Sequence, residues 1–398
     1  MNIKQVILLT LMSIAYFNLI AQNDFKITGK IADEKTGLPI EAANVYSNTT
    51  NEGTVTNNEG IFIFKLNHVI SSDSLIISNV GYKSMRLSIK NITNKPNELF
   101  KLIPISYVLK EVSIKPLPEA KEIINLAKEN LDKNYIQNPF LADCYFSEFI
   151  KEDGNYVRAM ELALQQYNKG PFPNPIIPIP FQQIKIVQKR KSANHTVLAD
   201  SPLNHCFSLN YLLVTGNLRN YLSIKNYKFT LDSIAILGNE SVYIITGVNE
   251  TEHVTYYITQ EGFKVIQLKF KWNQIMPKYR LGDSYFSIHR TEGKLVFKET
   301  DKILYPFYTS NILEINYYQN KSDTAIWHKQ VISSELLYNN IITENVKEIA
   351  KNERLQLLNY PNIYELTIPY DERFWDKYNY PVESMNRKLI YDSIKSKD

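Results

Sequence analysis

Residues 25–31 read Phe-Lys-Ile-Thr-Gly-Lys-Ile and alternate apolar with polar side chains, which is typical of a half-buried strand. Residues 61–64 (Ile-Phe-Ile-Phe) and 74–78 (Ser-Leu-Ile-Ile-Ser) are further short runs of strand-forming residues. Turn residues such as those at 57–60 (Asn-Asn-Glu-Gly) separate the runs. Short strands at regular spacing with no helical segment between them predict a β-sandwich.

Several segments of residues 25–114 resemble a known family. They are Ile27–Ile31, Thr36–Ile40, Ala43–Val45, Gly53–Phe62, Ile76–Tyr82 and Leu109–Ile114. In this order they resemble the carboxypeptidase regulatory-like domain, a transthyretin-type sandwich, and we expect seven strands. The closing Leu-x-Glu-Val strand is similar to the N-terminal extension of TonB-dependent receptors in the Bacteroidota. In metallocarboxypeptidases this module accompanies the catalytic domain and is not catalytic, so the resemblance implies a binding or folding module.

The N-terminus has the three parts of an export signal. Lys4 supplies a positive charge, residues 6–20 are mostly apolar, and Ala21 is a small residue at a suitable cleavage point. We therefore predict a signal peptide over residues 1–21 and an exported protein, periplasmic or associated with the outer membrane. No other stretch approaches the length of a membrane span, so any membrane association is expected to be peripheral.

A helical linker is expected over residues 115–139. Ile123, Ile124, Ala127 and Leu131 recur at a spacing near 3.6 residues, which indicates one buried helix face within residues 119–134. Residues 140–398 then form a β-rich domain of unknown function. Residues 152–155 read Glu-Asp-Gly-Asn and predict a hairpin turn, whereas residues 156–167 fit a strand or a helix.

The later strands of this domain are expected at 228–237, 242–247, 253–259, 264–272, 295–299, 312–318 and 325–333. They predict a large antiparallel sheet, curved or partly closed, so the predicted fold class is mainly β. The order of sandwich, helix, β-rich domain and Phe-Trp tail resembles uncharacterised exported proteins of the Bacteroidota. That resemblance implies no activity.

Composition and motifs argue against several function classes. The net charge is +4, with 45 basic and 41 acidic residues, and the densest basic run is residues 189–191, so we expect no nucleic-acid partner. His289 and Glu292 have the spacing of a zinc-ligand pair, but residues three apart on a strand face opposite sides. His205 and Cys206 are neighbours in sequence. A structural cysteine beside a polar histidine explains them better than a catalytic pair does. We therefore predict no enzyme, no cofactor and no metal site.

The chain has two cysteines, Cys144 and Cys206. The sequence is equally compatible with a disulfide between them and with two buried thiols. The aromatic residues Tyr256, Tyr257 and Trp272 lie on predicted hairpin strands, where core packing explains them better than a pocket.

Two segments are candidate partner contacts. Residues 170–181 are rich in proline and include Ile176, Ile177 and Pro178, which fit a docking loop or a spacer. Phe374 and Trp375 near the C-terminus fit a contact with a partner or an anchor on the chain itself.

These features predict a non-enzymatic accessory, binding or scaffold protein of the cell envelope, with an outer-membrane protein as its expected partner. The alternatives are a carrier or sensor of an apolar ligand in the second domain, and a hydrolase of envelope glycan or peptide.

Overall fold

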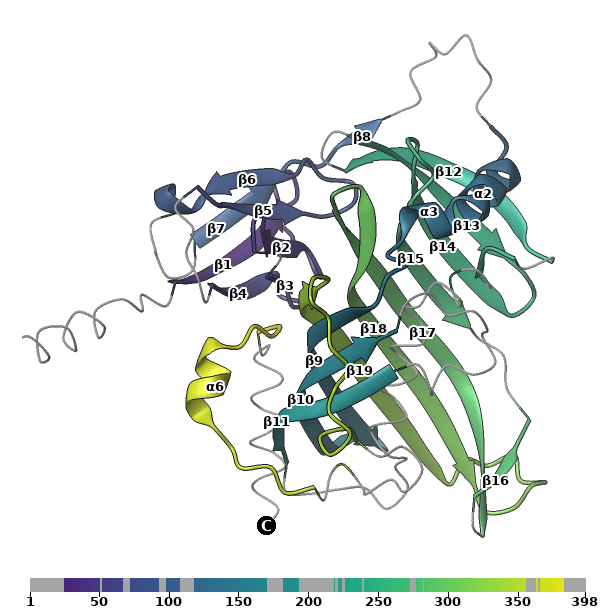
Figure 1. Cartoon of the computed structure of the whole chain (residues 1–398). Helices are drawn as coiled ribbons and strands as arrows, with labels where there is room; N and C mark the ends of the chain where they lie inside the picture. The colour runs from purple at the N-terminus through teal and green to yellow at the C-terminus, as the bar shows by residue number, and fades with distance from the viewer. Residues whose placement is uncertain are drawn as a thin grey trace, which may run out of the picture.

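The computed structural model describes residues 25–50, 52–66, 72–92, 98–107, 118–169, 182–192, 218, 221–223, 226–237, 240–272, 277–281, 283–355, 363 and 366–382. Within them the chain has two small N-terminal sheets, short helices and one large antiparallel sheet (Figure 1). The predicted mainly β fold class is confirmed. The predicted signal peptide, the candidate contact at Ile176–Pro178 and Cys206 lie outside the described residues. No helix among the described residues is long and apolar enough to cross a membrane.

Seven strands build the N-terminal sandwich, as predicted. One sheet has the order β4 (Ile61–Leu66), β1 (Phe25–Asp33) and β7 (Glu98–Leu102), and the other has the order β3 (Gly53–Val55), β2 (Asn44–Ser47), β5 (Ser74–Ser78) and β6 (Met85–Ser88). A 3-10 turn, η1 (Ile89–Asn91), follows β6. Alternate side chains of the two sheets, among them Phe62, Phe64 and Ile77, are fully buried between them. The period of two seen in the sequence therefore corresponds to the face that each side chain occupies.

The large sheet joins segments far apart in the chain. Its order is β11 (Gln182–Lys191), β10 (Asn155–Asn168), β9 (Phe140–Glu152), β19 (His328–Ile342), β18 (Ile303–Tyr318), β17 (Ser284–Thr300), β15 (Val265–Trp272), β14 (Glu252–Thr259), β13 (Glu240–Val248), β12 (Lys228–Leu237) and β8 (Ser106–Tyr107), with β16 (Tyr279–Leu281) paired to β17. Residues 156–167 belong to strand β10, so the helical alternative is wrong. Asp153 and Gly154 in the turn before them adopt positive φ and fold β10 onto β9, and pairing with β9 and β11 on both sides makes the segment a strand.

One face of the large sheet, here called the helix face, is covered by α2 (Ala120–Glu129) and α3 (Leu131–Asn134). The predicted apolar stripe is confirmed, because Ile123, Ile124, Ala127 and Leu131 are all buried against the sheet. Cys144 and Tyr256 are buried in the same core. Burying each aliphatic side chain of this kind stabilises the fold by roughly 1.5–3 kcal/mol. Packing of this apolar face therefore holds the helices on the sheet.

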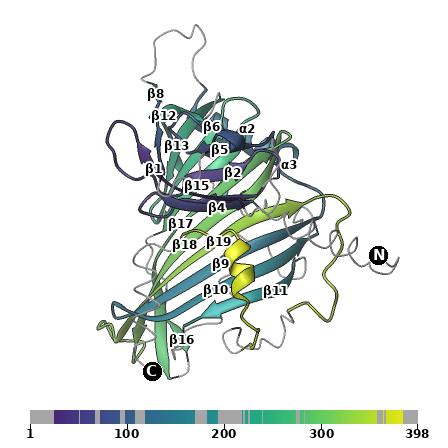
Figure 2. The same cartoon turned by 90° about the vertical axis from the view of Figure 1, so that its left-hand side faces the viewer.

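The opposite face, here called the sandwich face, carries the N-terminal sandwich and the short helix α6 (Glu372–Lys377), as Figure 2 shows. At its centre, Ala42 and Val55 of the sandwich pack against Val296, Phe307 and Leu337 of the sheet. The approach at Gly53 is close, since a Cβ there would lie 2.8 Å from the Phe307 ring. The sandwich therefore rests directly on the large sheet, and the chain leaves cavities around the contact.

Candidate functional site

A cleft lies at this contact, between the loop before β2 and strands β14, β15, β17 and β18. Its volume is about 550 Å³. We call it the junction cleft, and its lining is Glu41, Ala42, His253, Thr255, Lys269, Phe270, Lys271, Glu292, Gly293, Lys294, Tyr308, Ser310 and Ile312.

The register of the large sheet brings the polar residues of the junction cleft together. Thr255 pairs with Lys269, Lys269 with Lys294, and Lys294 with Ser310. A second row, two residues further along the strands, contains His253, Lys271, Glu292 and Ile312. Leu268 and Leu295, next to Lys269 and Lys294 in sequence, point to the helix face and are buried there. Successive side chains of a strand point to opposite faces of the sheet. The leucines therefore fill the core on the helix face, and the lysines next to them line the cleft.

Lys269 and Lys294 form a directly opposed cross-strand pair of like charges. Side chains in this arrangement lie roughly 4.5–5.5 Å apart at Cβ, and like charges there destabilise a sheet. Burial, followed by the positive charge of Lys269, lowers the pKa of Lys294 to about 8, and only Glu41 opposes the shift. No hydrogen bond or ion pair holds the Lys294 ammonium group in the part of the chain that the structure describes. The Lys269 ammonium group lies 5.7 Å from the ring centroid of Tyr257, a longer contact than that of Lys298 with Tyr46. The pair of like charges is an electrostatic cost that an anion bound near both lysines would offset.

Among the described residues, neither acidic residue of the cleft forms an ion pair with Lys269 or Lys294. Glu292 lies in the second row and forms an ion pair with Arg290 on its own strand. Glu41 is exposed on the sandwich side of the cleft. The hydroxyl groups of Thr255, Tyr308 and Ser310 line the same space and can donate or accept hydrogen bonds. The arrangement suits a polar ligand with an anionic group.

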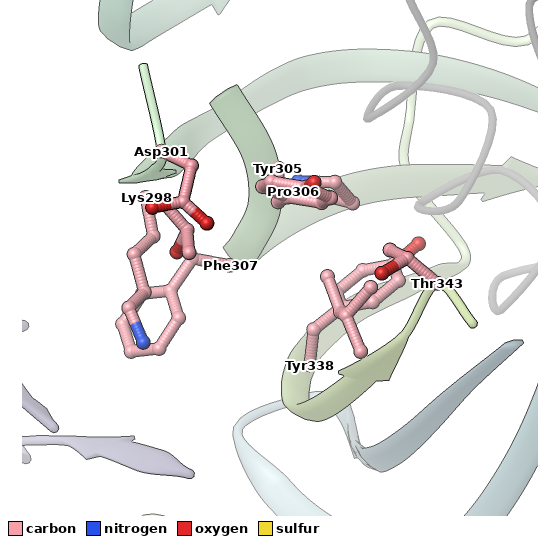
Figure 3. A pocket seen from close by; sticks show the side chains of 9 residues that line it. Lys298, Asp301, Tyr305, Pro306, Phe307, Tyr338 and Thr343 are labelled. Atoms are coloured by element: carbon pink, nitrogen blue, oxygen red, sulfur yellow. The ribbon is translucent and has the colours of Figure 1, made fainter. Parts of the chain in front are cut away.

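A smaller pocket of about 110 Å³ is lined by residues of β17, β18 and β19 and of the turns beside them (Figure 3). Figure 3 shows Lys298, Asp301 and Phe307 on one side of the pocket, with Tyr338 and Thr343 on the other. Burial lowers the pKa of Lys298 to about 7, and Asp73 acts in the opposite direction. The Lys298 ammonium group lies 4.3 Å from the ring centroid of Tyr46 in the sandwich. Cation–π contact therefore occupies this lysine, and the pocket is a weaker candidate than the junction cleft.

The structure places Phe374 and Trp375 in α6, on the sandwich face. Trp375 is 2% exposed, and the Arg190 guanidinium lies 4.5 Å from its ring centroid. Phe374 is half-buried and stacks on Tyr378 with a centroid distance of 4.9 Å. The side chain of Asp371 caps the helix by accepting hydrogen bonds from the backbone N–H groups of Arg373 and Phe374. Contact of these residues with a partner protein stays a prediction.

The C-terminal segment 371–380, here called the strap, joins the sandwich to the large sheet. Lys65 of β4 donates from Nζ to the carbonyls of Trp375 (2.9 Å) and Tyr378 (3.0 Å). Asn379 exchanges two hydrogen bonds with the Lys65 backbone, both of 2.8 Å. The amide of Asn339 on β19 donates to the Asn379 carbonyl at 2.7 Å. The strap thus fixes the position of the sandwich over the sheet, and with it the walls of the cleft.

The other residues considered from the sequence lie apart from one another. His289 is exposed on β17, and Glu292 faces the junction cleft. Among the described residues, no group of three or more His, Cys, Asp or Glu side chains is placed to hold a metal. Tyr256 is fully buried, and its hydroxyl donates to the Tyr221 carbonyl at 2.8 Å.

Sequence reasoning did not identify the junction cleft. The alternation of residues 268–272, Leu-Lys-Phe-Lys-Trp, shows that Lys269 and Lys271 share a face of a strand. It does not show which residue of another strand stands opposite them. A lysine at every second position of a predicted strand is the available signal, and it fits a solvated face equally well.

The N-terminal module agrees with a known domain family. Residues 27–114 match the model of the CarboxypepD_reg-like domain. The match spans the two small sheets and supports the resemblance drawn from the sequence. It covers none of the strands from β9 onward that line the junction cleft, so this domain contributes one wall of the cleft through Glu41 and Ala42. No curated protein matches the chain.

Three solved structures are similar over larger parts of the chain. A LolA superfamily protein from Nitrosomonas europaea has 11% identity and a TM-score of 0.21, covering 58% of this chain and 96% of that one. A DUF1329 family protein from Desulfovibrio piger has 10% identity and a TM-score of 0.23, with coverages of 56% and 94%. A protein of unknown function from Bacteroides fragilis has 11% identity and a TM-score of 0.16, with coverages of 80% and 98%. Scores of this size support no functional argument, which therefore rests on the cleft.

Proposed function

We propose that this chain is a non-enzymatic binding protein of the cell envelope, and that its junction cleft binds the anionic group of a polar ligand. The observation that carries the proposal is the opposed pair of Lys269 and Lys294. An anion seated between the two ammonium groups would accept hydrogen bonds from both. Charge-assisted hydrogen bonds of this kind contribute roughly 1.5–3 kcal/mol each.

The position of the cleft supports a binding role. Its floor is a sheet of four hydrogen-bonded strands, and its wall is the CarboxypepD_reg-like domain held by the strap. Rigid elements of this kind place charged groups precisely, which favours recognition of a ligand. The envelope location rests on the three-part export signal of residues 1–21.

A binding measurement tests the role of Lys294. The probes are inorganic sulfate and glucuronate, which carries a carboxylate group. Titration calorimetry should detect binding of at least one of them. In Lys294→Gln the affinity should fall by roughly 10–100-fold, since one charge-assisted hydrogen bond is lost and the neighbouring lysine stays. Lys101→Gln, which changes an exposed strand lysine of the sandwich, should bind as the wild type does.

Two results would contradict this function. Equal affinity of Lys294→Gln and the wild-type protein would place the anion elsewhere. Absence of anion binding, together with binding of a fatty acid by the wild-type protein, would favour the apolar carrier over the anion-binding protein.

The pH dependence of sulfate binding gives an independent test, because sulfate does not titrate near neutral pH. The groups that face Lys294 are Lys269, Lys271, His253, Glu41 and Glu292. Sulfate favours the protonated form of Lys294, whose pKa in the free protein is about 8. The affinity should therefore be highest below that pH and fall by up to about tenfold per pH unit above it. Lys294→Gln should lose the decline near pH 8, and an unchanged profile would exclude Lys294 from the site.

A further inference from the structure

The end of the large sheet farthest from the sandwich exposes three large apolar side chains. Tyr279 of β16 is 46% exposed, and Ile326 and Trp327 in the turn before β19 are 51% and 47% exposed. Figure 1 shows β16 at this end, below the long strands β17 and β18. We call the described residues 277–286 and 317–328 the sheet tip. Large apolar side chains gathered at one exposed place commonly mark an interaction surface.

The two turns of the sheet tip are fixed to each other. Lys278 donates from Nζ to the carbonyls of Lys321 (3.2 Å) and Asp323, and it lies 3.9 Å from the ring centroid of Tyr318. Across the strands, the Tyr279 ring packs on Phe286 at 5.6 Å, and Phe286 pairs with Tyr317. The exposed side chains therefore project from a braced structure.

The backbone also holds Trp327 in place. Its N–H donates to the Tyr317 carbonyl at 2.8 Å, and its ring lies 4.6 Å from that of His328. The side chain is nevertheless half-exposed, although the core of the molecule buries the other large aromatic residues of the neighbouring strands, such as Tyr317. Folding thus orders Trp327 without covering it.

The sheet tip has one more basic than acidic residue. Lys278, Arg280 and Lys321 are basic, and Asp283 and Asp323 are acidic. The Asp323 carboxylate accepts a hydrogen bond from the Asn320 backbone at 2.9 Å, so it is engaged inside the turn. Exposed tryptophan and tyrosine on a turn that also has basic residues match the chemistry of a lipid headgroup layer, where aromatic rings lie at the interface and lysines reach phosphates.

We propose that the sheet tip docks on the surface of an anionic lipid bilayer, with Trp327, Ile326 and Tyr279 in the headgroup region. A bilayer is favoured over a protein because three half-exposed side chains offer only a few hundred Å², roughly, whereas a stable protein interface buries about 800 Å² on each partner. The docking leaves the junction cleft, which is lined by residues from the middle of strands β17 and β18, open to solvent.

Vesicle flotation with the mature chain tests this docking. Vesicles of phosphatidylethanolamine with phosphatidylglycerol should carry the protein upward, and the tryptophan emission should shift to shorter wavelength. The variant Ile326→Ser/Trp327→Ser should bind at least about tenfold more weakly, because loss of roughly 1.4 kcal/mol of apolar transfer produces that change. Tyr370→Ser, an exposed aromatic residue outside the sheet tip (59% exposed), should float as the wild-type protein does.

Three outcomes would overturn the docking. The wild-type protein fails to float, or the double variant floats equally well, or floating is equal on vesicles of phosphatidylcholine alone and insensitive to salt. A concentration-dependent rise in sedimentation coefficient that the double variant abolishes would instead assign the sheet tip to contact between copies of this chain.

Discussion

Replacing Trp375 with alanine should lower the free energy of unfolding by about 3–5 kcal/mol, the range for truncating a buried aromatic side chain. Trp375 is 2% exposed and lies against Arg190, with Tyr378 and Tyr380 at centroid distances of 5.9 Å and 6.0 Å. The alanine variant leaves a cavity and removes one of the contacts of the Arg190 guanidinium, which also pairs with Glu161 and lies over the Tyr380 ring. Both effects act on the strap, which joins the sandwich to the large sheet.

The measurement is urea unfolding followed by circular dichroism and by fluorescence. The two signals should coincide in the wild-type protein and separate in Trp375→Ala, because the sandwich and the sheet lose a shared connection. Tyr370→Ala, which lies just before the strap and is 59% exposed, should change the stability by less than about 0.5 kcal/mol. If Trp375→Ala and Tyr370→Ala unfold at the same urea concentration, the strap does not stabilise the protein.

Replacing Arg158 with methionine should destabilise the protein by about 3–5 kcal/mol, because it breaks the buried ion pair with the Glu148 carboxylate. The Arg158 guanidinium donates from Nη2 to Glu148 Oε1 at 2.9 Å, and the two side chains are 4% and 1% exposed. They lie on the adjacent strands β10 and β9, where the hairpin turn at Asp153 sets the register.

The double variant Glu148→Leu/Arg158→Met gives the matched control. Replacing both members of a buried ion pair with apolar residues of similar size is often neutral, so this variant should recover most of the lost stability. Thermal and urea unfolding of the four proteins in the cycle measure the coupling between the two side chains. A double variant as unstable as Arg158→Met would show that methionine packing, and not the broken ion pair, causes the loss.

The hairpin of β9 and β10 shows where local sequence information was sufficient and where it was not. The turn residues Glu152–Asn155 predicted a reversal correctly, because positive φ at two adjacent positions depends on local chemistry. The strand after it stayed ambiguous with a helix, since Met160, Ala163 and Leu164 fit both periods. Pairing with β9 and β11 on both sides decided for the strand.

The residues near the C-terminus show the same limit. A Phe-Trp pair in a polar tail is equally consistent with a partner contact and with an anchor on the chain itself. In the structure, Trp375 contacts Arg190 of β11, which is far from it in sequence. It also contacts Tyr380 of the strap, beyond the end of α6. A pattern within the tail contains no information about the surface that the tail meets.

The sequence by itself determined the local features of this protein: the mainly β class, the CarboxypepD_reg-like pattern of residues 25–114, the buried stripe of α2, and the shared face of Lys269 and Lys271. Each depends on a period or a turn that neighbouring residues specify. Only the tertiary structure decided that Lys294 stands opposite Lys269 and that Glu41 lines the same cleft. The register of β15 against β17 depends on the packing of both faces of the sheet, and a shift of one residue would turn every side chain to the other face. The candidate site therefore arises from long-range register, which the local sequence does not encode.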